Sequence, residues 1–448
     1  MSYISLSDQD KKEMLARIGI STTEELFCCF PDEIRLKRGL RLPAAMPEPE
    51  LIWHFEALAA KNAAARYPSF LGAGSYVHFI PSIVDCLAAR GEFVTPYTPY
   101  QPEVSQGTLQ VVFEYQTLIC QLTGMDVANA SLYDGASAAA EAVLMAHRLN
   151  GRARVLVARS IHPHYRETIR TYTKNVGVTL DGIRAGETGA IDLDELAKKL
   201  DQDVAAVIVQ SPNFFGCIEN LEKIGQLAHD RQALLIATVA EAASLGILEA
   251  PGKLGADLVC GEAQSFGLPP SFGGPSLGFM GCRKEFVRQL PGRIAGQTKD
   301  VDGNRGFVLT LSTREQHIRR EKATSNICTN QALCAVRATI YLETMGQNGL
   351  KEMALHNFHK AHYAADRLAR LKGVRKKFSG KFFNEFVLEF PKSIQGLNGY
   401  LKGKGIIGGL DLGSFYPELG NCGLFCVTEV HKKDEIDGLV RAIEEGLR

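Results

Sequence analysis

The residues Asp134, Gly135, Ala136 and Ser137 have the types and order that suit the first turn of an anion-binding helix. Asp or Ser favours the N-cap position, Gly permits a tight turn, and the first backbone N–H groups of a helix lack partners within it. Those N–H groups and the helix dipole together stabilise a negative charge. The chemistry predicted here is the binding of an anion, although the same pattern also suits an ordinary strand-to-helix turn.

The surrounding stretch, residues 95–147, contains the elements that would position this turn. A loop dense in Tyr and Pro comes first, and apolar residues at helical spacing then predict a helix that ends at Gly124. Residues 127–132 can form a short buried strand, and an Ala-rich helix follows the turn. The alanines at 138–140 would let this second helix lie close to a sheet or to a ligand.

From Arg154 onward, short and nearly continuous apolar runs alternate with helical patterns. Such runs predict a parallel or mixed sheet that helices bury on both faces. Ligands of these sheets bind beyond the carboxyl ends of the strands. The strands are expected at 155–158, 178–183, 205–210, 233–239, 257–260 and 277–280.

Three regions are expected along the chain: a helical N-terminal arm over 1–65, a large α/β domain over 66–345 and a small α+β domain over 346–448. Prolines interrupt the helical pattern of the arm. Within the large domain, the polar stretch 296–306 has the composition of a linker, and residues 314–343 are expected to form one long helical region.

The composition excludes several classes of partner. Lysine plus arginine and aspartate plus glutamate both number 50, so the net charge is zero and neither a nucleic acid nor an anionic membrane is an expected partner. No apolar run approaches the ~18 residues of a membrane span, and the charged N-terminal sequence is unlike a secretory signal. Eleven cysteines without a C-x-x-C pair indicate reduced thiols in a cytoplasmic protein, with a metal site or a catalytic thiol as the alternative.

Five runs of residues carry a resemblance to the glycine decarboxylase family, the P-protein of the glycine cleavage system. They are Gly72-Ala73-Gly74-Ser75-Tyr76, YTPYQPEVSQG at 97–107, LTGM at 122–125, NASLYDGASAAAEA at 129–142 and GGPSLGFMGC at 273–282. The resemblance covers nearly the whole chain, whose 448 residues are similar to the first of the family's two half-length subunits. It implies fold type I of the pyridoxal-phosphate enzymes, with a mostly parallel seven-stranded sheet in a large α/β domain and a small C-terminal α+β domain.

This resemblance implies a set of residues around a cofactor pocket. His162 would stack on the pyridoxal ring, and Glu241 would face the pyridine nitrogen, where cofactor-carrying relatives have a shorter Asp. Ser211 begins a turn that lies near the cofactor in the family, and the amides of residues 135–137 would hold the phosphate. Gln264 stands where those relatives have the Schiff-base lysine, and an amide cannot form an imine. The chain would therefore keep the scaffold without the covalent anchor.

The missing lysine fits the two-subunit form of the family, in which the sister subunit carries the lysine and pyridoxal phosphate. The resemblance implies that the active site takes residues from both chains, so this chain would complete the site of its partner. Tyr97, Tyr100 and Gln101 are the candidates, because their loop offers hydroxyl and amide donors among rigid prolines. A loop that only packs at the interface is the alternative. The implied assembly is an α2β2 heterotetramer.

The resemblance further implies that the complex decarboxylates glycine and passes the aminomethyl group to the lipoyl arm of the H-protein. No metal is expected to take part. Two other functions stay open: a self-sufficient enzyme that uses an unexpected lysine, and a non-catalytic scaffold or regulatory homologue of the same fold. Visible absorbance of a cofactor on the chain alone would identify the first, and a neighbouring gene for a second half-length chain with His-Lys-Thr would argue against the second.

Overall fold

The computed structural model describes residues 5–448, and the chain divides into two compact units, 1–65 and 66–448. The α-helices of the first unit are α1 (Asp8–Ile18) and α2 (Glu48–Ala59). Neither helix buries a side chain, and the indole of Trp53 is 64% exposed. The first four residues of the expected arm lie outside the described residues. Taken by itself, this unit leaves its apolar side chains in contact with water.

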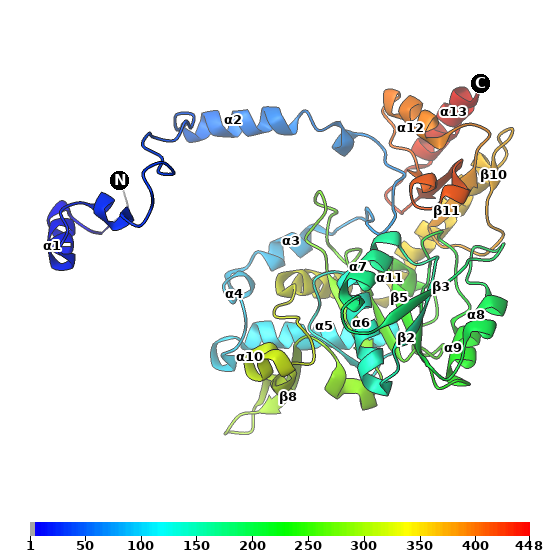
Figure 1. Ribbon diagram of the computed structural model, residues 1–448. Coiled ribbons are helices and arrows are strands. Elements are labelled where there is room, and N and C mark those ends of the chain that lie inside the picture. The colour runs from blue at the N-terminus through cyan, green and yellow to red at the C-terminus, as the bar shows by residue number, and fades with distance from the viewer. Residues whose placement is uncertain (1–4) are drawn as a thin grey trace. The chain divides into compact units, whose positions relative to one another are not determined.

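A seven-stranded sheet forms the centre of the second unit (Figure 1). Its strands lie in the order β1-β7-β6-β5-β4-β2-β3. Strands β2 to β6 run parallel, whereas β7 pairs antiparallel with both β6 and β1. The strands are β1 (Val127–Ala128), β2 (Arg154–Ala158), β3 (Thr179–Ile183), β4 (Val204–Gln210), β5 (Leu234–Val239), β6 (Leu258–Glu262) and β7 (Gly278–Cys282). The expected mostly parallel sheet is thereby confirmed.

Helices pack on this sheet where apolar residues recur at helical spacing. Helix α6 packs against β4 to β7, α9 packs against β5, and α5 packs against the long helix α11. The α-helices between residues 66 and 233 are α3 (Ser82–Ala88), α4 (Gly91–Val94), α5 (Gln106–Thr123), α6 (Gly135–Asn150), α7 (Pro163–Thr173), α8 (Leu193–Lys199) and α9 (Leu221–His229). Helix α11 is Ala332–Leu368. Every residue of β4 is buried, as expected for a central strand covered on both faces.

A second sheet, antiparallel and four-stranded, follows in the order β10-β11-β13-β12. Its core is a separate apolar cluster that includes Phe386 and Phe425. The elements here are β10 (Arg375–Lys376), β11 (Glu385–Glu389), α12 (Ile394–Gly403), β12 (Leu410–Asp411), β13 (Cys422–Cys426) and α13 (Lys433–Leu447). Since residues 66–448 form one compact unit, the division after residue 345 stays a prediction.

The expectation of a linker at 296–306 is wrong, because this stretch belongs to an antiparallel hairpin. Strands β8 (Ile294–Lys299) and β9 (Arg305–Thr310) pair with each other here. Ala295 and Phe307 belong to a small apolar cluster with residues of α5. The other residues of the hairpin are largely exposed, which is why its sequence has the composition of a linker.

The prediction of one long helical region over 314–343 is wrong for the part before Ala332. Helix α11 extends from Ala332 to Leu368, with a kink at Gly346, and short turns precede it, among them α10 (Gln316–Arg319). Arg320 has a positive φ of 53°, which a continuing right-handed helix does not allow. The strand expected at 127–132 is also shorter. It consists of β1 and an isolated bridge between Leu132 and Gly278.

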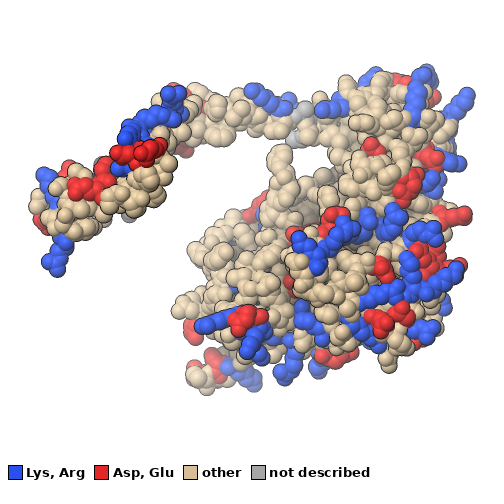
Figure 2. All heavy atoms as spheres, in the orientation of Figure 1, with Lys and Arg blue, Asp and Glu red and all other residues tan. Residues whose placement is uncertain are grey.

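The surface of the molecule carries both signs of charge. Figure 2 shows Lys and Arg side chains interspersed with Asp and Glu on the visible face, in keeping with the net charge of zero. Among the described residues, every helix is too short or too polar to cross a membrane. All eleven cysteines of the sequence are free thiols.

Candidate active site

The residues expected after β2, β5 and β6 gather at the carboxyl edge of the central sheet. His162, Glu241 and Gln264 are all buried, and the Ser265 hydroxyl donates to Glu241 Oε1 at 2.7 Å. One stretch of chain, residues 72–79, contacts all three predicted residues. We call this stretch the sealing segment.

Gln264, at the position of the missing lysine, is hydrogen-bonded to the backbone of the sealing segment. Its Oε1 accepts the N–H of Tyr76 at 2.9 Å, and its Nε2 donates to the Tyr76 carbonyl at 3.0 Å and to the Leu268 carbonyl. The amide thus uses its acceptor oxygen and both of its hydrogens. A lysine at this position would have no atom to accept the Tyr76 N–H.

His162 has its ring covered by the same segment. The ring accepts the N–H of His164 at Nδ1 (3.1 Å) and donates from Nε2 to the Ala73 carbonyl (2.8 Å), which places its proton on Nε2. Burial lowers the pKa of His162 to about 4, so the ring is neutral. Gly74 lies directly against it, because a Cβ there would be 3.0 Å from the ring atoms. The sealing segment therefore covers the edge of the ring that carries Cδ2 and Nε2.

Glu241 is paired with an imidazolium from the sealing segment. His78 Nε2 lies 3.2 Å from Glu241 Oε2, and His78 Nδ1 lies 2.8 Å from Glu429 Oε2. Burial alone would lower the pKa of His78, but the two carboxylates raise it to about 10. His78 is therefore charged at neutral pH. A cationic ring with an N–H on Glu241 occupies the place expected for a pyridinium.

The predicted anion site at the start of α6 is filled by carboxylates of the chain itself. Glu262 accepts the N–H of Gly135 at 3.0 Å, and Asp134 accepts the N–H of Ser137 at 2.7 Å. Burial raises the pKa of Glu262 to about 7, opposed by the backbone N–H groups that it accepts. A helix thus begins at the predicted position, and its Gly135 N–H is bonded to the Glu262 carboxyl group. The binding of an external anion here stays a prediction.

Glu385, from the C-terminal sheet, anchors the sealing segment from its other side. It accepts the N–H of Ala73 at 2.6 Å and the hydroxyl of Tyr76 at 2.8 Å. Burial raises the pKa of Glu385 to about 7. The backbone passes so close that a Cβ on Gly72 would lie 2.5 Å from the Glu385 carboxylate. Only glycine fits at this point.

These contacts decide whether pyridoxal phosphate fits this pocket. The ring needs an open face on His162, the pyridine nitrogen needs the carboxylate of Glu241, and the phosphate needs the N–H groups at the start of α6. Gly74 lies against one edge of the His162 ring, His78 is paired with Glu241, and Glu262 accepts the N–H of Gly135. The residues present do not fit the cofactor.

Two further residues predicted for the pocket are Ser211 and Ala136. Ser211 Oγ accepts the N–H of Glu219 at 3.2 Å, and the Glu219 carboxylate also accepts from Asn213 and Ser160. Ala136 is half-buried in the first turn of α6. Their membership of a cofactor pocket stays a prediction.

The Tyr-Pro loop, residues 95–105, has a different character. Tyr97, Tyr100 and Gln101 are all exposed, with 84% of Tyr97 and 52% of Tyr100 accessible to water. Tyr100 and Gln101 line an open cavity of about 810 Å³ between the loop and the start of α5. Arg293, which the sequence did not single out, donates to the Tyr100 hydroxyl at 3.2 Å. The loop thus presents polar side chains outward.

Comparison with known proteins identifies the family. The family model of the glycine cleavage system P-protein matches residues 1–443. The chain is 52% identical over 446 residues to the probable glycine dehydrogenase (decarboxylating) subunit 1 of Desulfitobacterium hafniense, covering 99% of this chain and 100% of that protein. It is 55% identical over 443 residues to the protein of the same description from Moorella thermoacetica, covering 99% of both. The chain belongs to the glycine cleavage system P-protein family.

Solved structures confirm the fold type I class for this P-protein chain. The crystal structure of a P-protein glycine decarboxylase, in inhibitor-bound form, matches with a TM-score of 0.90 at 44% identity and covers 100% of both chains. A Burkholderia pseudomallei sphingosine-1-phosphate lyase (0.69, 14% identity, 93% and 94% covered) and a NifS-like protein (0.62, 16% identity, 85% and 98% covered) share the fold.

Sequence reasoning missed the residues that fill the pocket of this P-protein chain. His78 and Glu241 are 163 residues apart, and Glu385 is 312 residues from Ala73, so no local pattern connects them. A signal was nevertheless present. His78 in YVHFI and Glu385 in NEFVLEF are titratable residues within apolar runs, and a buried charge requires a partner.

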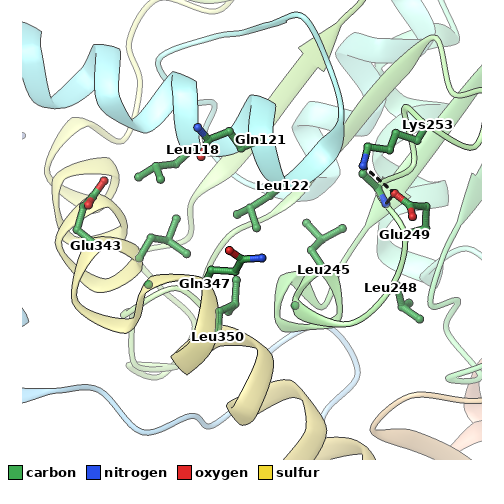
Figure 3. A pocket seen from close by; sticks show the side chains of 14 residues that line it. Leu118, Gln121, Leu122, Leu245, Leu248, Glu249, Lys253, Glu343, Gln347 and Leu350 are labelled. Atoms are coloured by element: carbon green, nitrogen blue, oxygen red, sulfur yellow. Dashed lines mark hydrogen bonds and ion pairs between the residues drawn. The ribbon is translucent and has the colours of Figure 1, made fainter.

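A further cavity of about 530 Å³ lies between α5, α11 and the turn η4 (Ala242–Gly246) (Figure 3). Its lining is rich in leucine, namely Leu118, Leu122, Leu245, Leu248, Leu342 and Leu350. Glu249 and Lys253 form an ion pair of 3.2 Å at one side. None of the residues predicted for the site of this P-protein chain lines the cavity.

Proposed function

We propose that this chain is the lysine-lacking subunit of a decarboxylating glycine dehydrogenase, whose sister subunit holds pyridoxal phosphate covalently. The filled pocket carries this proposal. Gln264, His78 and Glu262 occupy the positions at which the cofactor would be bound, yet the fold around them is that of the family. A chain with the family fold and no open pocket is suited to completing the site of a neighbour. The description of its relatives as subunit 1 supports a second subunit.

The proposed assembly is a cytoplasmic α2β2 heterotetramer, with glycine as substrate and the lipoyl arm of the H-protein as acceptor of the aminomethyl group. Pyridoxal phosphate, when bound to the sister subunit, supplies an electron sink for the loss of carbon dioxide. This chain contributes Tyr97, Tyr100 and Gln101, whose O–H and N–H groups would bind and orient groups at the neighbouring site. Free thiols throughout the chain suit a reducing compartment.

The test is co-expression with the sister subunit, followed by measurement of exchange between glycine and labelled bicarbonate. We expect exchange to require both chains and cofactor absorbance to belong to the sister subunit. Exchange at the full rate by the sister subunit alone would favour the scaffold or regulatory homologue. Cofactor absorbance of this chain, purified alone, would contradict the filled pocket.

A further inference from the structure

A buried arginine, Arg293, holds the Tyr-Pro loop from the inner side. Its side chain is only 5% exposed. One nitrogen, Nη2, donates to the Tyr100 hydroxyl at 3.2 Å and to the Cys328 carbonyl at 2.7 Å, while Nη1 donates to Asn330 Oδ1 at 3.0 Å. The guanidinium carbon lies 5.4 Å from the centroid of the Tyr100 ring. The loop tyrosine is therefore fixed to a rigid, charged group.

The direction of the hydrogen bond between Arg293 and Tyr100 follows from the two groups themselves. A guanidinium has five N–H donors and no acceptor, so the Tyr100 oxygen must accept. A phenolic hydroxyl has one hydrogen, which Tyr100 then keeps for another acceptor. Tyr100 as a whole is 52% exposed and lines the open cavity beside the loop.

The charge near this hydroxyl selects the kind of acceptor. Arg293 is always protonated, and its Nε has no hydrogen-bond partner among the described residues. The Glu315 carboxylate lies 3.8 Å from Nε, and His317 packs edge-on against the Tyr100 ring with centroids 5.5 Å apart. A hydroxyl that accepts from a cation is polarised as a donor and pairs most strongly with an anionic oxygen.

We propose that Arg293 is a positioning residue, which orients the Tyr100 hydroxyl so that its hydrogen is offered to an anionic oxygen held by the neighbouring subunit. This inference rests on the proposed function, because the acceptor lies in the sister subunit's site. Two groups there have such an oxygen: the carboxylate of glycine and the phosphate of the cofactor.

A double-mutant cycle on the co-expressed complex tests the inference. Tyr100→Phe should lower glycine–bicarbonate exchange about tenfold to hundredfold, as expected for a charge-assisted hydrogen bond. Arg293→Lys keeps the charge but lacks the planar fork, and should lower exchange by no more than Tyr100→Phe. In the Tyr100→Phe background, Arg293→Lys should have no further effect beyond about twofold. Reductions that multiply, a larger effect of Arg293→Lys, or no effect of Arg293→Lys would each overturn the positioning role.

Two more variants keep the test decisive. Asn330→Ala removes one anchor of the guanidinium and retains its charge, so it should show the same non-additivity with Tyr100→Phe if Arg293→Lys does not fold. Arg305→Lys is the matched control, because Arg305 lies over the Phe307 ring at 5.5 Å in strand β9, in the hairpin that follows Arg293. Exchange by this control should equal that of the unmodified complex.

The kinetic constants separate the two acceptors. If the acceptor is the glycine carboxylate, Tyr100→Phe and Arg293→Lys should both raise the KM for glycine. If it is the phosphate, both should raise the concentration of pyridoxal phosphate that gives half-maximal exchange. Unchanged exchange by Tyr100→Phe would remove the loop from the proposed function and the inference with it. A lowered rate of Tyr100→Phe with an independent effect of Arg293→Lys would remove the positioning role alone.

Discussion

The pocket under the sealing segment and the surface around the Tyr-Pro loop differ in how their buried polar atoms are satisfied. In the pocket, the carboxylates of Glu241, Glu262 and Glu385 all have hydrogen-bond donors. On the loop side, several buried polar atoms of the described chain have no partner: Thr108 Oγ1, Asn129 Oδ1, Arg293 Nε and Glu315 Oε1. Unpaired buried groups are rare and require an explanation.

The three carboxyl groups of the pocket are therefore satisfied within this chain. Within the pocket, His78 places a positive charge beside Glu241, and the Glu262 carboxyl group accepts the N–H of Gly135. The loop side instead presents the exposed side chains of Tyr97, Tyr100 and Gln101 to water. The proposed function therefore predicts that substitutions in the pocket change stability and that substitutions in the loop change exchange.

The largest expected effect comes from removing the cation of the pocket. His78→Ala leaves the carboxylates of Glu241 and Glu429 buried without a counter-charge, and we expect the free energy of unfolding to fall by about 3–5 kcal/mol. Urea unfolding of the purified chain measures this. His356→Ala, at a histidine whose side chain is 57% exposed, is the control and should stay within about 0.5 kcal/mol. Equal urea midpoints for the two variants would contradict the role of His78 in stabilising the pocket.

The ion pair of His78 also predicts how stability depends on pH. The folded pKa of His78, about 10, exceeds its value of 6.5 in the unfolded chain, so folding favours the protonated ring. Its contribution to stability is complete below about pH 6.5 and is lost as the pH rises through 10. The difference in unfolding free energy between the unmodified chain and His78→Ala should therefore shrink from pH 7 to pH 10. A difference that grows over this range would contradict the assigned ion pair.

Restoring the lysine should not restore the site. Gln264→Lys removes the acceptor of the buried Tyr76 N–H, which should cost about 1–3 kcal/mol in unfolding free energy. Incubation of the variant with pyridoxal phosphate should give no visible absorbance band, because His78 and Glu262 still fill the pocket. Gln121→Lys, on the exposed side of α5, is the control for stability. A stable variant with a cofactor band would show that the pocket is open.

The smallest expected effect is on the loop. Tyr97→Phe removes one hydroxyl from an exposed ring, so the complex should assemble normally while exchange falls roughly twofold to tenfold. Tyr400→Phe, on α12, serves as the control with an exposed ring. If the loop only packs at the interface, Tyr97→Phe should be silent and Tyr97→Ala should reduce co-purification with the sister subunit.

The fold could be predicted where the determining information is local. The run at 205–210 corresponds to β4 because a central parallel strand is apolar along its whole length. The hairpin of β8 and β9 could not be predicted in the same way, since only a few of its residues, among them Ala295 and Phe307, are buried. A polar strand pair that packs through a few side chains has the composition of a loop.

The candidate site shows the same limit more strongly. The positions of His162, Glu241 and Gln264 after their strands followed from the pattern and the resemblance. What fills the space between them did not, because His78 and Glu385 reach the pocket from distant parts of the chain. Departures from the family motif, such as Gln264, indicate that a function is lost, but only the structure describes what replaced it.

The sealing segment also has a consequence for evolution. It is held by Gln264, Glu241 and Glu385, which come from separate parts of the chain. Any substitution that reopened one of the filled positions would first lower stability and would bring no catalysis until the others had changed as well. Selection removes chains that fall below the stability needed for function, so such intermediates would not persist. The filled pocket of this chain is therefore protected against reopening one mutation at a time.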